Sequence, residues 1–351
     1  MKSKRMISIL LGIMLLFVTE TTCFVSVADD GEKILKEFNQ DDYITEVVNE
    51  NNSITKTLVR NEGGISPASN SEVDNLRIIN TVRATLLELG MLEEEIEGLS
   101  VDELYHYYTS PYISVTKSFV VERSDGSIEY ISEADMNAYL AVAGKKEETE
   151  KTNKNGIPTR SVTDSYMTIT HTVSADSTSL GKYYFSTSGY WNTMPFWRLN
   201  DSIGSCAQNL AVDDDTRGGY YSYYVETVSN SYVNSSHPVY NITTYDNALN
   251  GNWYGSVGIF SLPLDSSLGG TTVTCSFLFA TFHYYGYVNL PTLPSYFNSV
   301  GSYDHKELAI VSDGISIGVG VGDGFSASIG LTFIFGHTRR SEEVLIYHNG
   351  N

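Results

Sequence analysis

The sequence predicts an α+β protein that is mainly β, in which a small acidic helical region precedes an antiparallel β-sandwich or barrel-like domain. Three observations support this. Residues 29–160 hold 13 basic and 26 acidic side chains, whereas residues 161–351 hold only 6 and 15. The second part also contains 18 of the 25 tyrosines. Its short alternating runs are separated by turn residues, which is typical of an antiparallel sandwich.

The chain begins with the features of an export signal. A basic start precedes an apolar stretch at residues 7–18, and a small-x-small sequence places cleavage between Ala28 and Asp29. The apolar stretch has 12 residues, whereas a membrane-spanning helix needs about 20. We therefore expect a cleaved signal peptide (1–28), no transmembrane segment, and a protein that works outside the cell or in the cell envelope.

Cleavage makes an acidic chain more acidic. It removes three basic residues and one acidic residue, which leaves 19 Lys and Arg against 41 Asp and Glu and a net charge of −22. Such a chain repels nucleic acid and anionic lipid headgroups. Nucleic acid is therefore excluded as a partner.

The mature chain is predicted to have four segments. Residues 29–70 are polar and rich in Asn, so we expect a loosely ordered N-terminus. Residues 71–143 are predicted to form a small domain of helices and a hairpin. Residues 144–160 lack apolar periodicity and indicate an exposed linker. Residues 161–351 are predicted to form the β-sandwich.

Local signals place the helices of the small domain. Ser71 begins a capping-box-like start, apolar residues recur at helical spacing after it, and Gly90 closes the helix. Ser100 begins a shorter helix that ends near Pro111, and residues 112–131 alternate as a hairpin.

The β domain is predicted to contain ten short strands. They lie near residues 164–174, 181–190, 219–229, 237–245, 253–262, 271–285, 306–311, 314–321, 325–335 and 342–348.

The C-terminal hairpin (315–335) has the clearest pattern. Apolar residues alternate with Ser and Gly on both sides of a Gly-Asp-Gly turn. A three-residue turn pairs Val321 with Phe325 and Ile317 with Ile329, which brings the alternating apolar residues of both strands to one face. We predict that register.

Two cysteines remain after cleavage, Cys206 and Cys275. An even number of cysteines in an exported chain permits a disulfide, and closing a loop of this length stabilises by roughly 4 kcal/mol. Cys275 lies in an apolar strand, where a buried thiol is equally ordinary. The sequence leaves both alternatives open.

The motif search yields no catalytic residue, metal ligand or cofactor site. Residues 314–318 match the G-x-S-x-G string, but Ser316 belongs to a continuous β alternation with no helix after it. The seven histidines lack metal-binding spacing. Whether the protein is an enzyme stays open, with the balance against it, because carboxylates brought together only by folding leave no sequence spacing.

Exposed aromatic side chains are the remaining candidates for recognition. Tyr and Trp occur in adjacent pairs on predicted strands, and neighbouring residues of a strand point to opposite faces. One member of each pair is therefore expected outside the core. The candidate surface is Tyr221, Tyr223, Trp253 and Tyr285.

The order of these features resembles a known group of proteins. The export start is followed by Leu89-Gly90-Met91, by an aromatic stretch at 190–198 with Asp201-Ser202-Ile203, and by the Ser/Gly-rich hairpin. This arrangement is similar to uncharacterised secreted proteins of Gram-positive bacteria. The resemblance spans most of the mature chain and implies no activity, cofactor or site residue.

Three functions are compatible with the sequence. The leading hypothesis is a secreted, non-enzymatic binding or structural module with cell-wall glycan or protein as its partner. The first alternative is a membrane-active or pore-forming protein that uses the 315–335 hairpin, whose second strand meets the 9–11 residues needed to span a membrane. The second is a secreted hydrolase that uses Asp or Glu pairs in the β domain, brought together by folding.

Overall fold

The computed structural model describes fifteen stretches of the chain. They are residues 33–37, 43–49, 52–60, 72–123, 128–150, 164–193, 200–229, 232–248, 253–263, 265–268, 270–288, 295–304, 315–321, 325–331 and 340–348. The predicted signal peptide and the Ala28–Asp29 cleavage site lie outside them. The protein is mostly β with antiparallel sheets and few helices, which confirms the predicted fold class.

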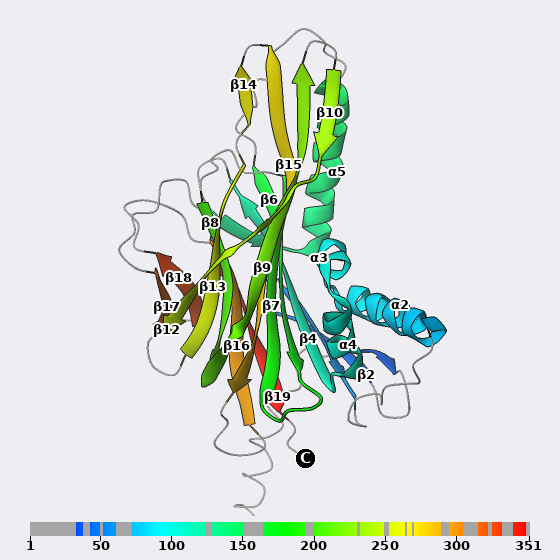
Figure 1. The fold of residues 1–351 in the computed structure, drawn as a ribbon, viewed down its shortest axis with the longest axis vertical. Coiled ribbons are helices and arrows are strands. Elements are labelled where there is room, and N and C mark those ends of the chain that lie inside the picture. Colours follow the sequence, from blue (N-terminus) through cyan, green and yellow to red (C-terminus); the bar gives the residue numbers. More distant parts are fainter. Residues whose placement is uncertain are drawn as a thin grey trace, which may run out of the picture.

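A twelve-stranded sheet, the large sheet, runs through the molecule (Figure 1). Its order is β1 (Lys33–Glu37), β2 (Tyr43–Val48), β3 (Ile54–Val59), β4 (Tyr112–Glu122), β6 (Ser165–Ala175), β7 (Lys182–Thr193), β15 (Thr271–Val288), β9 (Leu210–Ser229) and β10 (Tyr232–Ser236). Three short strands join it: β5 (Ile128–Ile131) on β4, β14 (Ser266–Leu268) on β15, and β11 (Val239–Asn241) on β9.

A five-stranded sheet, the small sheet, faces it. Its order is β12 (Thr243–Ala248), β13 (Trp253–Ser261), β8 (Asn200–Gln208), β16 (Ser295–Asp304) and β19 (Arg340–His348). The sequence did not predict β8 or β16, because their many Ser, Gly, Asn and Asp residues hide the alternation of a strand.

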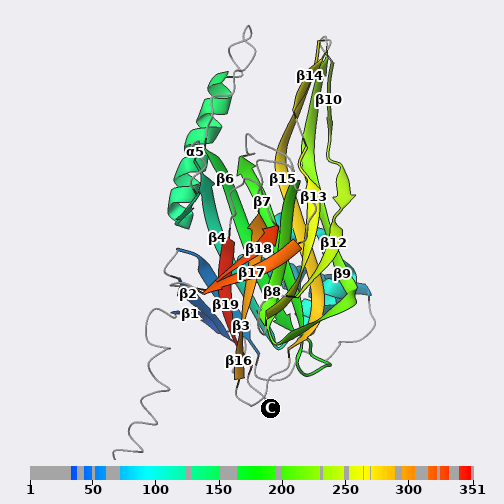
Figure 2. The same ribbon diagram turned by 90° about the vertical axis from the view of Figure 1, so that its left-hand side faces the viewer.

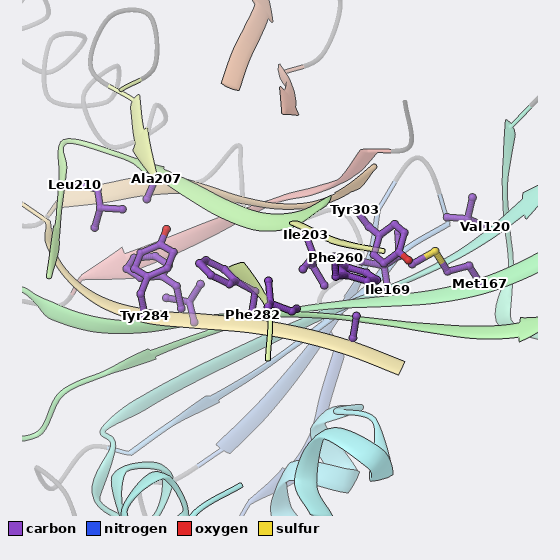
Figure 3. Packing of buried hydrophobic residues seen from close by; sticks show 14 of the residues in the cluster. Val120, Met167, Ile169, Ile203, Ala207, Leu210, Phe260, Phe282, Tyr284 and Tyr303 are labelled. Carbon is purple, nitrogen blue, oxygen red and sulfur yellow. The ribbon is translucent and has the colours of Figure 1, made fainter. Parts of the chain in front are cut away.

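The main core lies between the two sheets (Figure 3). Alternate residues of β15, among them Phe282 and Tyr284, point toward Ile203 and Ala207 of β8. All four side chains are fully buried. Removing this apolar surface from water drives the packing of the two sheets.

A hydrogen-bonded chain crosses this core. The Trp191 indole N–H donates to the Tyr303 hydroxyl at 2.9 Å, and that hydroxyl donates to an Asp201 carboxylate oxygen at 2.5 Å. The three residues are fully buried and come from β7, β16 and β8. Trp191 and Asp201 belong to the aromatic stretch and the Asp-Ser-Ile string noted in the sequence, so these motifs join the sheets.

Three helices cover the other face of the large sheet (Figure 1). They are α2 (Glu72–Leu89), α3 (Glu93–Gly98) and α4 (Val101–Thr109), here called the helical cap. As predicted, Gly90 ends α2 with a positive φ of 97°, and Ser100 begins α4 through a capping box with Glu103. α3 was not predicted, and it lies between the two predicted helices. A fourth helix, α5 (Glu133–Glu150), packs through Met136 on β4 and β5.

The expectation of a loosely ordered segment at 29–70 is wrong for much of that segment. It contains β1, β2 and β3, which continue the large sheet outward from β4. Ile44 and Leu58 are buried beneath the cap. β3 pairs with β4, which lies more than 50 residues away in the sequence, and this long-range pairing holds the three strands in the sheet.

The predicted division into two domains is also not the arrangement observed. β4 from the first part pairs with β6 from the second over ten residue pairs, from Ile113–Ser174 to Glu122–Ser165. The two parts therefore build one sheet. The helix α5 continues to Glu150, seven residues into the predicted 144–160 linker, and the rest of that linker lies outside the described residues.

The C-terminal hairpin has the predicted register. β17 (Ile315–Val321) and β18 (Phe325–Leu331) pair Val321 with Phe325 and Ile317 with Ile329. Among the described residues they form a two-stranded sheet of their own (Figure 2). The strand predicted at 306–311 lies outside the described residues.

Candidate functional site

The large sheet extends beyond the sandwich as a narrow ribbon. The pairing of β15 with β7 ends at Phe279–Tyr190, and beyond it the described strands that pair with β15 are β9 and β14. The ribbon consists of residues 223–229, 232–236, 266–268 and 271–277. Both views show it projecting at one end of the molecule, and α5, which points the same way, lies apart from it in Figure 2.

The ribbon exposes apolar and aromatic side chains. Tyr232 and Val233 are neighbours on β10 and point to opposite faces, yet they are 69% and 59% exposed. Further exposed side chains on the ribbon and at its base are Tyr224, Val228, Val239, Tyr240 and Phe277. Within the ribbon's strands the only charged residue is Glu226, and the carboxylate of Asp265, directly before β14, accepts a hydrogen bond from the Cys275 N–H at 2.8 Å. An exposed apolar group of this kind marks an interaction surface more often than an isolated residue does.

A bulge marks the base of the ribbon. The β15–β9 register shifts between Ser276 and Phe279, and Phe277 has a positive φ of 54°. A bulky residue rarely adopts this left-handed conformation. Phe277 is nevertheless half exposed, so core packing does not account for it. Bulges often re-aim side chains at functional surfaces.

Two of the predicted aromatic residues, Tyr221 and Tyr223, lie in one stack at the base of the ribbon. Ring centroids are 5.0 Å apart for Phe260 and Tyr221, 5.2 Å for Tyr221 and Tyr240, and 5.7 Å for Tyr240 and Tyr223. Burial and the hydrogen bond to Tyr240 raise the pKa of the Tyr223 hydroxyl. The rings cover each other's faces, which disfavours sugar stacking between them.

The other two predicted aromatic residues lie elsewhere. Tyr285 packs beneath the cap, with its ring centroid 4.9 Å from that of Tyr184 and 5.3 Å from that of His106. Trp253 begins β13 opposite Gln208, and its side chain lies outside the described part of the chain. The predicted surface is therefore not one site.

The two cysteines are buried thiols in the structure, with no disulfide between them. Cys206 lies on β8 in the small sheet, and Cys275 lies on β15 at the base of the ribbon. Burial raises the pKa of the Cys206 thiol, which makes it a poor nucleophile.

A second group of polar residues lies between the cap and the large sheet. Glu95 of α3 is 2% exposed, and its carboxylate accepts hydrogen bonds from Ser186 at 2.8 Å and from Thr170 at 3.0 Å. Burial raises the pKa of Glu95 to about 7, against the opposing effect of these hydrogen bonds. Sequence reasoning missed it, because Glu93-Glu94-Glu95 is typical of a solvated helix.

Glu103 adjoins Glu95, and two histidines, His106 and His283, adjoin Glu103. Burial raises the pKa of Glu103, but hydrogen bonds from Ser100 and from the Tyr184 hydroxyl outweigh it, and the net pKa is lowered. Burial lowers the pKa of His106 to about 4 and also lowers that of His283, whose Nδ1 lies 3.9 Å from Glu103.

This buried cluster has the perturbed pKa values that often accompany catalysis. Its carboxylates, however, accept hydrogen bonds from Ser, Thr and Tyr side chains of the sheet and from the Ser100 cap. The arrangement fastens the helical cap to the sheet. It does not place a carboxylate pair in the β domain, as the hydrolase hypothesis requires.

Comparison with known proteins leaves the chain without a family assignment. It matches no protein-family model, and no curated protein is significantly similar to it. Among the described residues, no group of three or more His, Cys, Asp or Glu side chains is placed to hold a metal ion. Within the same residues, no helix has the length and apolarity required to cross a membrane.

Proposed function

We propose that this protein is a secreted, non-enzymatic binding module that attaches to an extracellular surface through its projecting ribbon. The observation that carries the proposal is the exposure of aromatic and apolar side chains on a nearly uncharged ribbon that extends beyond the sandwich core. Proteins normally protect an exposed sheet edge with charges, proline or a bulge. β10 contains none of these over Tyr232–Ser236 and pairs with β9 without a register shift.

The export signal at residues 1–28 supports the secretion part of this proposal, and the resemblance to secreted proteins of Gram-positive bacteria agrees with it. The sandwich and the helical cap then serve as the support of the ribbon. Their hydrogen-bonded clusters, Trp191–Tyr303–Asp201 and Glu95 with its partners, fix the two sheets and the cap relative to each other.

The test is retention of labelled mature protein on extracellular surfaces. Intact Gram-positive cells, purified cell wall and phosphatidylcholine vesicles form the panel. Val233→Asp introduces a charge on the ribbon, and Val101→Asp is the matched control because Val101 is 67% exposed on the cap. Wild type and the control should bind at least one surface, and Val233→Asp should bind it at least five-fold more weakly. The proposal is contradicted if neither wild type nor Val101→Asp is retained on any surface. It is also contradicted if wild type, Val101→Asp and Val233→Asp are retained equally.

A second candidate function rests on a separate observation. The hairpin of β17 and β18 has the register that brings its apolar residues to one face, and it belongs to neither sheet of the sandwich. This supports a membrane-active role. Each described strand has seven residues, however, whereas crossing a bilayer takes about 9–11. Dye release from vesicles tests this candidate, and no release from several lipid compositions would eliminate it.

A further inference from the structure

We infer that the partner of the ribbon is the interfacial layer of an uncharged or zwitterionic lipid bilayer; this inference rests on the proposed function. A protein or a glycan covers one face or one edge of a sheet. Tyr232 and Val233 lie on opposite faces, and both are more than half exposed. A lipid interface is an environment that contacts both faces of a narrow ribbon at once.

The charge distribution selects the lipid. The mature chain has a net charge of −22, which opposes contact with anionic headgroups. The ribbon's strands contain Glu226 as their only charged residue, and Asp265 is bonded to them at Cys275. The two longest strands of the ribbon, residues 223–229 and 271–277, extend over roughly 20 Å, whereas the Debye length is about 8 Å at physiological ionic strength. The ribbon therefore contacts a neutral surface while the charges of the sandwich stay largely screened from it. The charges of α5, which points the same way and has five acidic and two basic residues, add to the repulsion of anionic lipid.

The edge of the ribbon limits the depth of insertion. In the described part of the chain β10 is the last strand of the large sheet, so its outward N–H and C=O groups have no strand partner there. Unpaired backbone groups do not enter the hydrocarbon layer. They can be hydrated at headgroup level, where Tyr is enriched in membrane proteins. Tyr232, exposed at the tip of the ribbon opposite Ser229, suits that depth. The ribbon thus binds without spanning the bilayer.

A fluorophore on the ribbon tests this inference. Ser235→Cys places one exposed thiol on β10, while Cys206 and Cys275 are buried and shielded from labelling in the folded protein. The label is the environment-sensitive dye NBD. Ser177→Cys is the control, because it is exposed in the β6–β7 turn at the opposite end of β15, where Lys182 pairs with Tyr287.

Phosphatidylcholine vesicles should raise the NBD emission at residue 235 at least two-fold and shift it to the blue. The label at residue 177 should not change, and trapped dye should stay inside the vesicles. Replacing half of the lipid with phosphatidylglycerol should weaken binding, more so at 0.01 M than at 0.15 M salt. An unchanged emission at residue 235, or an equal change at both positions, overturns the inference.

The outcomes separate this inference from the proposed function. If Val233→Asp abolishes retention on cells or cell wall while wild type ignores vesicles, the ribbon binds a glycan or a protein and the lipid inference is wrong. If wild type, Val233→Asp and Val101→Asp are retained equally on every surface, the proposed function fails as well. Dye release with no change at residue 235 assigns the lipid contact to the hairpin instead.

Discussion

Replacing Glu95 with Gln should change the pH dependence of stability in a defined way. In the folded protein the pKa of Glu95 is about 7 because of burial, compared with a value of 4.5 for a free Glu side chain. Below pH 4.5 the carboxyl is neutral in both the folded and unfolded states. As pH rises from 4.5 to 7, the unfolded state releases its proton first, and the folded state loses stability.

The size of the effect follows from the two pKa values. At about 1.4 kcal/mol per pKa unit, the free energy of unfolding of the wild type should fall by about 3 kcal/mol over this range through Glu95 alone. The amide of the Glu95→Gln variant cannot ionise, and its oxygen still accepts a hydrogen bond from Thr170 or Ser186. The stability of Glu95→Gln relative to the wild type should therefore rise by about 3 kcal/mol between pH 4.5 and pH 7.5.

Urea unfolding of both proteins at several pH values measures this difference. The buried histidines affect both proteins alike. Burial lowers the pKa of His106 to about 4 and that of His171 to about 3, so the fold loses stability as pH falls below 6.5 and the unfolded state takes up protons first. Their effects cancel in the comparison. Glu103→Gln should change stability with the opposite pH dependence. The lowered pKa of Glu103 in the wild type means that its carboxylate stabilises the fold at neutral pH, and this stabilisation is lost on acidification. A stability difference between Glu95→Gln and wild type that is the same at pH 4.5 and 7.5 would refute the reasoning.

Three further predictions concern the fold. Trypsin cleavage between Lys145 and Arg160 should leave two fragments that co-elute in gel filtration, because β4 and β6 share one sheet; separation would restore the two-domain division. Gly98→Ala should destabilise by about 1–3 kcal/mol through overpacking, because its Cβ would lie 1.7 Å from the Tyr220 hydroxyl oxygen. Adding Tyr220→Phe should recover part of this loss. If the effects of the two substitutions on the free energy of urea unfolding are strictly additive, the contact is contradicted. Denatured, unreduced protein should take up two alkyl groups at Cys206 and Cys275 by intact mass, whereas none would indicate a disulfide.

The sequence predicted features whose causes are local. Gly90 and Ser100 end and begin helices through capping within a few residues, and the β17–β18 register follows from alternation on either side of one turn. It failed where distant strands decide the structure. β1 to β3 depend on pairing with β4, and β8 has too few apolar residues to show its burial.

The candidate surface was predicted only in part, because local alternation places two of its residues and long-range packing places the others. Tyr221 and Tyr223 lie two residues apart on β9 and therefore face the same side, as alternation requires. Tyr285 belongs to β15, where the cap covers it, and no sequence signal indicated that cover. The projection of the ribbon depends on where β7 stops pairing with β15, which is a property of the assembled sheet.

The most direct test of the ribbon as the contact element is hydrogen exchange of the mature protein, free and bound to whichever surface retains it. In the free protein the outward amides of β10 should exchange rapidly, because no described strand covers them. Binding should slow exchange across residues 223–236 and 271–277 and leave the helical cap and the 315–331 hairpin unchanged. Protection confined to the cap or the hairpin, with the ribbon exchanging as in the free protein, would contradict the account.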